Sequence, residues 1–212
     1  MGKEISIARK YNMHQKSVIN GLILAGGRSK RMGFDKAWIN YHGKPQVQNL
    51  FEILSSLCKR VFISCKLNQT NEFKYLGPVI PDATEVTGPA AALLSAFKFD
   101  PDSSWLVVAC DLPFINRAGL QKLIVERDPS KVATVYINPD NNLPEPLIGI
   151  WEPKAVKMIE SYVQQVITCP RKMLIQSDVK LLVPDHTMLI ANINTPEEYK
   201  KAKSRLRINS QG

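Results

Sequence analysis

The chain has 212 residues and lacks the signatures of several common protein classes. No apolar run approaches the roughly 18 residues that a membrane-spanning helix needs, so we expect no contact with a membrane. The N-terminus has no apolar signal core, which argues against secretion and favours a cytoplasmic protein. The cysteines form no CxxC pair and show no zinc spacing, as is typical of reduced, mostly buried thiols. They are Cys58, Cys65, Cys110 and Cys169.

Familiar catalytic and nucleotide-binding patterns are missing as well. No GxSxG is present, and the 3 histidines match no catalytic spacing, so a hydrolase with a nucleophilic side chain is unsupported. Neither GxxxxGK[ST] nor GxGxxG occurs, which excludes a Walker loop and the dinucleotide fingerprint.

The net charge of +9 lies mainly at the two ends of the chain. Residues 1–16 carry a net charge of +3 and residues 200–212 carry +5, which leaves +1 for the rest. A nucleic-acid-binding protein carries its basic stripe on the folded body, so we expect no nucleic acid as partner and solvated basic ends. The expected organisation is a loose leader over residues 1–17, one domain over residues 18–207 and a tail over residues 208–212.

Strand and helix patterns alternate along the chain. Apolar runs at 18–24, 60–65, 105–110, 132–137 and 147–151 predict strands, and 78–80 predicts a short one. Helical spacing recurs at 47–58, 88–99 and 117–127, whereas the polar, proline-rich residues 138–146 predict a loop. This alternation predicts a single-domain three-layer α/β/α sandwich with a mostly parallel, Rossmann-like sheet. Ligands of such sheets bind at the carboxyl ends of the strands.

Residues 24–36, LAGGRSKRMGFDK, follow the first strand and are the most informative stretch. Two glycines allow a sharp turn whose free amides can face an anion. Cations crowd the same turn, which favours triphosphate binding over an ordinary turn with a solvated basic face. They are Arg28, Lys30, Arg31 and Lys36.

Asp111 comes directly after the apolar strand at 105–110. A carboxylate facing a triphosphate is suited to Mg²⁺, which prefers oxygen ligands and shares phosphate oxygens. A cap on the following helix, or a turn before Pro113, would also explain this aspartate.

The pattern L-A-G-G-x-x-x-R-M-G-x-D-K resembles nucleotidyltransferases that activate a small phosphorylated molecule with a nucleoside triphosphate. It is most similar to the molybdenum cofactor guanylyltransferases, the MobA family. The resemblance covers roughly residues 18–200. It implies transfer of GMP from GTP to the phosphate of molybdopterin, with Mg²⁺ as cofactor and pyrophosphate as product. Transient contact with cofactor-insertion proteins and molybdoenzymes is a further expectation.

The resemblance also implies roles for particular residues. Asp111 would hold Mg²⁺, Lys36 would hold the α-phosphate, and Arg31 would hold the leaving phosphates with the amides of the glycine turn. The nucleotide-binding set is Leu24, Ala25, Gly26, Gly27, Lys36, Ser64, Asp82, Gly88 and Asp111. Asn192 and Asn194, in an N-x-NTPE element, would bind the pterin substrate, with Asn194 near the metal or the phosphate.

Two departures from the family pattern bear on the nucleotide. Ser64 stands where relatives often have asparagine, and Ala91–Ala92 stands where the family often has a further glycine. Two other functions stay open. One is transfer of another nucleotide on the same fold, such as cytidylyl transfer or activation of a sugar phosphate, and the other is a non-catalytic nucleotide-binding or cofactor-escort protein. Gly26 favours guanylyl over cytidylyl transfer, since cytidylyl relatives usually carry alanine there.

Overall fold

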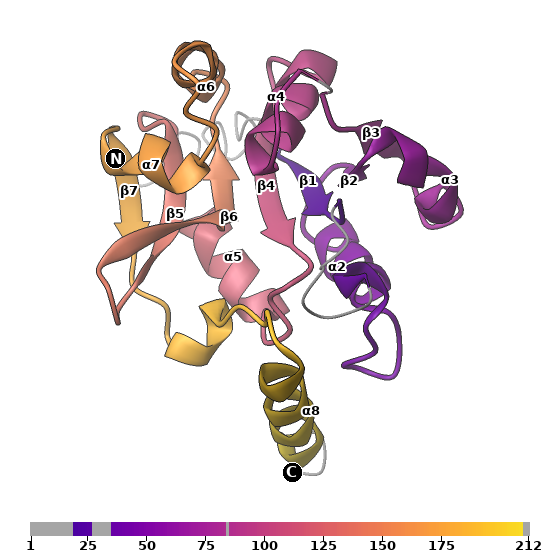
Figure 1. Cartoon of the computed structure of the whole chain (residues 1–212). Helices are drawn as coiled ribbons and strands as arrows, with labels where there is room; N and C mark the ends of the chain where they lie inside the picture. Colours follow the sequence, from indigo (N-terminus) through magenta and orange to yellow (C-terminus); the bar gives the residue numbers. More distant parts are fainter. Residues whose placement is uncertain (1–18, 27–34, 84, 210–212) are drawn as a thin grey trace, which may run out of the picture.

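One sheet of seven strands, in the order β3-β2-β1-β4-β6-β5-β7, organises the computed structural model (Figure 1). The structure describes residues 19–26, 35–83 and 85–209. The strands are β1 (Ile19–Leu24), β2 (Val61–Cys65), β3 (Val79–Pro81), β4 (Ser104–Ala109), β5 (Ala133–Asn138), β6 (Leu143–Trp151) and β7 (Val179–Leu182). The helices are η1 (Lys36–Trp38), α2 (Gln46–Ser55), η2 (Leu67–Gln69), α3 (Thr70–Phe73), α4 (Pro89–Phe99), α5 (Arg117–Val125), α6 (Ala155–Gln164), α7 (Pro170–Ile175), η3 (Thr187–Ile190) and α8 (Pro196–Asn209).

The strand pairings confirm the mostly parallel sheet, with β6 as the exception. β6 runs antiparallel to both of its neighbours, β4 and β5. The prediction of a loop over residues 138–146 is wrong at both ends: β5 includes Asn138, and β6 begins at Leu143. Pro144 and Pro146 are tolerated because β4 pairs with β6 only from Ile148 onward, so the start of β6 has one partner strand and needs fewer backbone donors.

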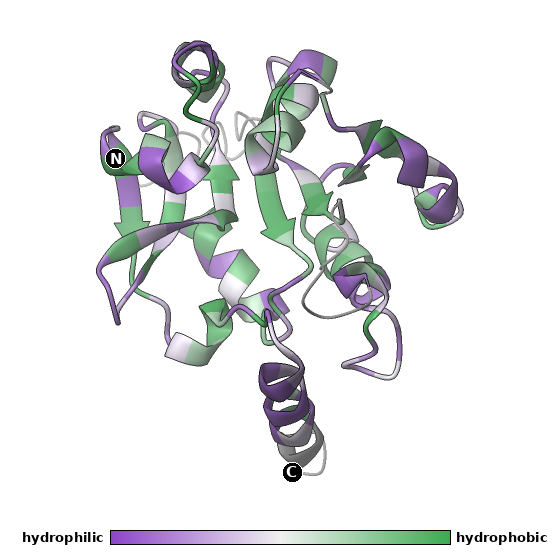
Figure 2. Ribbon diagram, viewed as in Figure 1, coloured by the Kyte–Doolittle hydropathy of each residue, from purple (hydrophilic) through white to green (hydrophobic). Residues whose placement is uncertain are grey.

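Helices cover both faces of the sheet, as the three-layer prediction requires. Alternate side chains of a strand point to opposite faces, and the two hydrophobic clusters follow this alternation. Ile23 of β1 packs in a cluster with side chains of α2, α3 and α5. Leu22, its neighbour, packs in the second cluster with side chains of α4, α6 and α7. Figure 2 shows the central strands β1 and β4 as strongly apolar.

The basic C-terminal end forms a helix, and its side chains Lys200, Lys201 and Arg205 are exposed, as expected of a solvated basic end. Residues 200–209 belong to α8, which starts with the predicted capping box: Glu198 N–H donates to Thr195 Oγ1 at 3.2 Å, and Glu198 Oε2 accepts from Thr195 N–H at 3.1 Å. Ala202 of this helix is buried against Ile39 and Ile193. This apolar contact explains why a strongly hydrophilic helix, visible in Figure 2, stays attached to the domain.

None of the helices in the described ranges is both long enough and apolar enough to traverse a bilayer. The leader predicted over residues 1–17 lies outside the residues that the structure describes.

The sheet order reverses beside β1. From β1 the chain moves outward through β2 to β3, and then returns to place β4 on the other side of β1. The connections that leave the carboxyl ends of β1 and β4 therefore diverge, and a crevice forms between them.

Candidate active site

A cavity of about 730 Å³ opens at the carboxyl ends of β1, β2, β3 and β4. Most of the predicted nucleotide-binding residues line it, although they come from four separate chain segments. They are Leu24, Ala25, Gly26, Lys36, Ser64, Asp82, Gly88 and Asp111. Gly27 and Arg31 lie outside the described residues. The segments after these strands therefore line one cleft, as the strand-end argument predicts.

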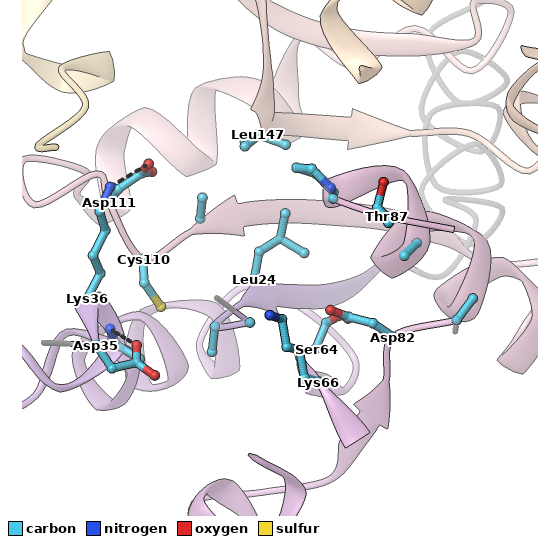
Figure 3. Close-up of a pocket in the computed structure, with 18 of the residues that line it drawn as sticks. Leu24, Asp35, Lys36, Ser64, Lys66, Asp82, Thr87, Cys110, Asp111 and Leu147 are labelled. Carbon is cyan, nitrogen blue, oxygen red and sulfur yellow. Dashed lines mark hydrogen bonds and ion pairs between the residues drawn. The ribbon is translucent and has the colours of Figure 1, made fainter. Parts of the chain in front are cut away.

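One end of the cavity holds a cation between two oxygen-bearing side chains. Lys36 Nζ lies 2.6 Å from Asn194 Oδ1 and 3.5 Å from Asp111 Oδ2. Figure 3 shows the Lys36 side chain extending toward Asp111. The structure thus joins a residue of the glycine-loop motif to a residue of the N-x-NTPE element. This is the arrangement that binding and neutralising phosphate oxygens requires.

Backbone contacts hold this end in place. Ile193 N–H donates to the carbonyl oxygen of Asp111 at 2.9 Å, which fixes the segment before α8 beside the end of β4. Glu198 Oε2 also accepts from the N–H of Asn194 at 2.7 Å. The capping box therefore does two things: it starts α8, and it orients Asn194 toward Lys36.

Asp35 positions Lys36 from the other side. Its Oδ1 accepts from Ala37 N–H at 3.0 Å, which caps η1, and its Oδ2 accepts from Gln69 Nε2 at 3.0 Å. Ala37, the next residue, is fully buried. These contacts explain the aspartate of the motif as a structural anchor for the lysine that follows it.

Asp111 has the properties of a ligand for a hard cation. Its Oδ1 is buried, and no group among the described residues forms a hydrogen bond with it. Burial raises the pKa of the carboxyl, and the nearby Lys36 opposes this shift. A buried carboxylate oxygen without a donor is costly unless a cation or solvent completes it. The helix cap that offered an alternative explanation of Asp111 is supplied by Asn116, whose Oδ1 accepts from Gly119 N–H at 2.9 Å.

The site offers Mg²⁺ one carboxylate. The described part of the chain contains no group of three or more histidine, cysteine or acidic side chains arranged for a metal. A single aspartate fits a Mg²⁺ ion that takes its remaining ligands from phosphates and water. It does not fit a structural metal held entirely by the protein.

The opposite end of the cavity has a different chemistry. The hydroxyl of Ser64 donates to Asp82 Oδ1. Gly26 lies close to the ends of β2 and β3. A Cβ atom built on Gly26 would lie 2.9 Å from Asp82 Oδ2 and 3.2 Å from Cys65 Cα. Burial raises the pKa of Asp82, while the Ser64 hydrogen bond and the charge of Lys66 oppose the rise. Ala91, the first alanine of the pair that departs from the family pattern, also lines this cavity.

A second cavity, of about 420 Å³, adjoins the first. The two share Thr87, Gly88, Pro89, Asp111 and Leu147. Asn192 and Asn194, the predicted acceptor-binding residues, line the second cavity. Asp111 thus lies where the two cavities meet.

Two side chains of the second cavity were missed in the sequence. Glu145 is buried and accepts from Arg171 Nη2 at 2.7 Å and from Asn138 Nδ2 at 3.1 Å. The acidic residue between two prolines was assigned to a loop, so nothing indicated that it faces inward from β6. Arg171 is the second residue of the short helix α7, which is too short to show a periodic pattern.

Comparison with known proteins gives consistent matches. Residues 21–180 match the family model described as the MobA-like NTP transferase domain. A molybdenum cofactor biosynthesis bifunctional protein of Synechocystis sp. is 39% identical over 180 residues, which are 84% of this chain and 52% of that protein. The chain therefore spans about half the length of this relative.

Two further proteins match over most of their length. A molybdenum cofactor guanylyltransferase of Pseudomonas aeruginosa is 30% identical over 83% of this chain and 90% of its own. The crystal structure of molybdopterin-guanine dinucleotide biosynthesis protein A from Archaeoglobus fulgidus superposes with a TM-score of 0.75 at 24% identity, over 91% of this chain and 100% of that one. The structural match supports the Rossmann-like nucleotidyltransferase fold. From the family model and these relatives, the chain belongs to the MobA-like NTP transferase family.

Proposed function

We propose that the protein transfers GMP from GTP to the phosphate of the molybdopterin cofactor and releases pyrophosphate. The observation that carries the proposal is the group formed by Lys36, Asp111 and Asn194 at the junction of two cavities. One cavity is lined by the glycine-turn residues and suits a nucleotide. The other contains the asparagines of the N-x-NTPE element and suits the acceptor.

In the proposed reaction, an oxygen of the acceptor phosphate attacks the α-phosphorus of GTP. The bond from that phosphorus to the bridging oxygen of the β-phosphate breaks, and pyrophosphate leaves. Such a transfer depends on positioning and charge neutralisation rather than on a covalent intermediate. No nucleophilic side chain is therefore needed.

The roles of Lys36, Asn192 and Asn194 follow from where their side chains lie. Lys36 would hold an α-phosphate oxygen, because its ammonium reaches the junction and Asn194 keeps it there. Amides of Ala25 to Gly27 and the Arg31 side chain would hold the leaving phosphates. Asn192 and Asn194 would orient the acceptor from the second cavity.

Asp111 would hold Mg²⁺ through its unpaired carboxylate oxygen. When bound, Mg²⁺ would neutralise charge on the phosphate oxygens. Asp111 would act here as a carboxylate, and its ion pair with Lys36 keeps both groups within reach of one phosphate.

We further propose a cytoplasmic location, which agrees with the free cysteines of the described residues. Transfer of the product to cofactor-insertion proteins or molybdoenzymes would require transient contacts. The domain between the two basic ends has a net charge of only +1, which gives no reason to expect a nucleic-acid partner.

The test is an assay of dinucleotide formation with purified protein, Mg²⁺, molybdenum-loaded molybdopterin, and either GTP or CTP. Formation of the guanine dinucleotide, with loss of product in Lys36→Ala, is expected. Product from CTP alone would replace the proposal with cytidylyl transfer. Tight GTP binding without turnover of any acceptor would favour an escort protein.

A further inference from the structure

Lys66 is a cation that none of the proposed catalytic steps uses, yet it lines the nucleotide cavity. It follows β2 directly and caps η2, where its carbonyl oxygen accepts from Gln69 N–H at 2.8 Å. Its side chain is exposed. Among the described residues, its ammonium has no hydrogen bond or ion pair. A cation held at a cavity wall without a protein partner is available to a ligand.

The position of Lys66 associates it with Asp82 rather than with the phosphate end. The backbone N–H of Asp82 donates to the carbonyl oxygen of Cys65 at 2.8 Å, so the two side chains leave adjacent strand ends. Figure 3 places Lys66, Ser64 and Asp82 at one end of the cavity and Lys36 and Asp111 at the other. If the triphosphate lies at Lys36, the base extends toward Lys66.

The surroundings of Lys66 suit an aromatic base. Leu67, the next residue, is 63% exposed and also lines the cavity. Leu24 and Val86 contribute further apolar surface. Flat apolar contacts of this kind would hold a base without selecting among bases, so selection requires polar groups at its edge.

Asp82 and Lys66 together present an acceptor and a donor. Ser64 occupies Oδ1 of Asp82, which leaves Oδ2, the atom nearest to Gly26. Guanine has N–H donors at N1 and N2 next to the acceptor O6. A carboxylate beside an ammonium matches this order, and lysine is a common partner of guanine O6. Adenine and cytosine carry an amino group where guanine has O6, and this group would face the ammonium.

We propose that Lys66 determines nucleotide specificity by donating to O6 of guanine while Asp82 accepts from the N1 and N2 side. The proposal rests on the proposed function in one respect, namely that GTP binds in this cavity. It assigns to Lys66 the donor role that Ser64 cannot fill while its hydroxyl is bound to Asp82.

The experiment measures binding of three triphosphates by calorimetry in the presence of Mg²⁺. GTP is compared with the 2,6-diaminopurine analogue, in which an amino group replaces O6, and with inosine triphosphate, which lacks the N2 amino group. The protein variants are Lys66→Met, Lys66→Arg and the control Lys74→Met. Lys74 is also exposed, directly follows α3, and does not line the cavity.

We expect Lys66→Met to weaken GTP binding about tenfold and to leave binding of the diaminopurine analogue unchanged, as for loss of one charged hydrogen bond. The preference for GTP over inosine triphosphate should stay constant, because it depends on Asp82. Lys66→Arg should keep the preference for O6, and Lys74→Met should behave like the wild type.

Equal weakening of GTP and the diaminopurine analogue would overturn the proposal, since it would mean that Lys66 contacts the ribose or the phosphates. Unchanged affinity for both would overturn it as well. In either case the wild type still binds GTP, so the proposed function survives. Absence of GTP binding by the wild-type protein would refute both together.

Discussion

The ammonium group of Lys36 lies 2.6 Å from the side-chain oxygen of Asn194, which comes 158 residues later in the chain. This contact ties the glycine-loop segment to the segment before α8. It also means that neither residue acts alone: Asn194 restricts where the ammonium points, and Asp111 at 3.5 Å restricts it from the other side.

We therefore expect Lys36→Ala to lower guanylyl transfer by about 10²–10³-fold, the usual effect of removing one preorganised charge-stabilising donor. Asn194→Ala should lower it less, because the lysine remains. The double variant should be only slightly worse than Lys36→Ala, with a coupling of about 0.5–3 kcal/mol in the mutant cycle. The measurement is turnover at saturating GTP and Mg²⁺.

Lys44→Ala provides the matched control for this cycle. Lys44 forms a surface ion pair with Glu52 and does not line either cavity. The turnover of the Lys44→Ala variant should equal that of the wild type. Strictly additive losses in Lys36→Ala and Asn194→Ala would contradict the idea that Asn194 acts by orienting Lys36.

Gly26→Ala tests the close packing at the base end of the cavity. The added Cβ would lie 2.9 Å from Asp82 Oδ2 and 3.2 Å from Cys65 Cα. Because a side-chain carboxylate moves more easily than a strand backbone, we expect Asp82 to be displaced. GTP affinity, measured by calorimetry, should fall about tenfold, while the midpoint of thermal unfolding should change little.

The control for Gly26→Ala is its combination with Asp82→Ala. Once the carboxylate is gone, the extra methyl group has nothing to displace on that side. The double variant should then bind GTP no worse than Asp82→Ala alone. A further loss of about tenfold in the double variant would mean that the methyl group acts on the strand backbone instead.

A buried ion pair lies beside the start of β4, at the opposite end of that strand from Asp111. It provides a stability prediction that is independent of the site. Glu152 is 2% exposed and accepts from Arg127 Nη2 at 2.6 Å and from Ser104 Oγ at 2.8 Å. Glu152→Ala removes the buried carboxylate that accepts from Arg127, so the free energy of unfolding should fall by about 3–5 kcal/mol.

Chemical denaturation measures this loss. The matched control is Glu126→Ala, which removes a partly exposed pair with Lys180 at 3.7 Å and should cost at most about 1 kcal/mol. Both variants should retain the GTP affinity of the wild type under native conditions. Equal losses in the two variants would show that burial of Glu152 adds nothing to its ion pair.

The parts of the site that were predictable from the sequence are those at strand ends. Gly26, Ser64 and Asp111 follow or end apolar runs, and parallel strands bring their carboxyl ends to one edge. The direction of β6 was not predictable, because an apolar run has the same period in either orientation. Glu145 was missed for a different reason: its proline-rich surroundings predicted a loop, whereas its pairing with β5 makes it part of a strand that lines the second cavity.

Contacts between distant segments were also beyond a local pattern. The N-x-NTPE element contains a capping box that explains its threonine and glutamate by itself. Its asparagines reach the site only because Ile193 N–H forms a hydrogen bond with the carbonyl oxygen of Asp111. The spacing of residues along the chain does not predict that contact.

Asp111 links activity to stability in a way that pH can test. Burial raises its pKa in the folded protein above the ordinary value for an aspartate, about 3.9. Between these two values the folded state binds more protons than the unfolded state, so stability falls as pH rises through this window. Ionisation of this carboxyl in the folded protein therefore costs stability, although the ion pair with Lys36 offsets part of the cost.

Asp111→Asn removes this charge while keeping the size of the side chain. With metal chelated, the variant should be more stable than the wild type at pH 7, and the difference should shrink as the pH falls toward 4. Added Mg²⁺ with GTP should stabilise the wild type more than the variant, because binding to the folded state alone raises stability. Turnover of the variant should fall by about 10²–10³-fold.

The control is Asp102→Asn, at an exposed position before β4, which should change none of these quantities. If the difference in the free energy of unfolding stays constant with pH, ionisation of Asp111 does not destabilise the folded protein. The idea that its unpaired oxygen is a site for a cation would then lose its support.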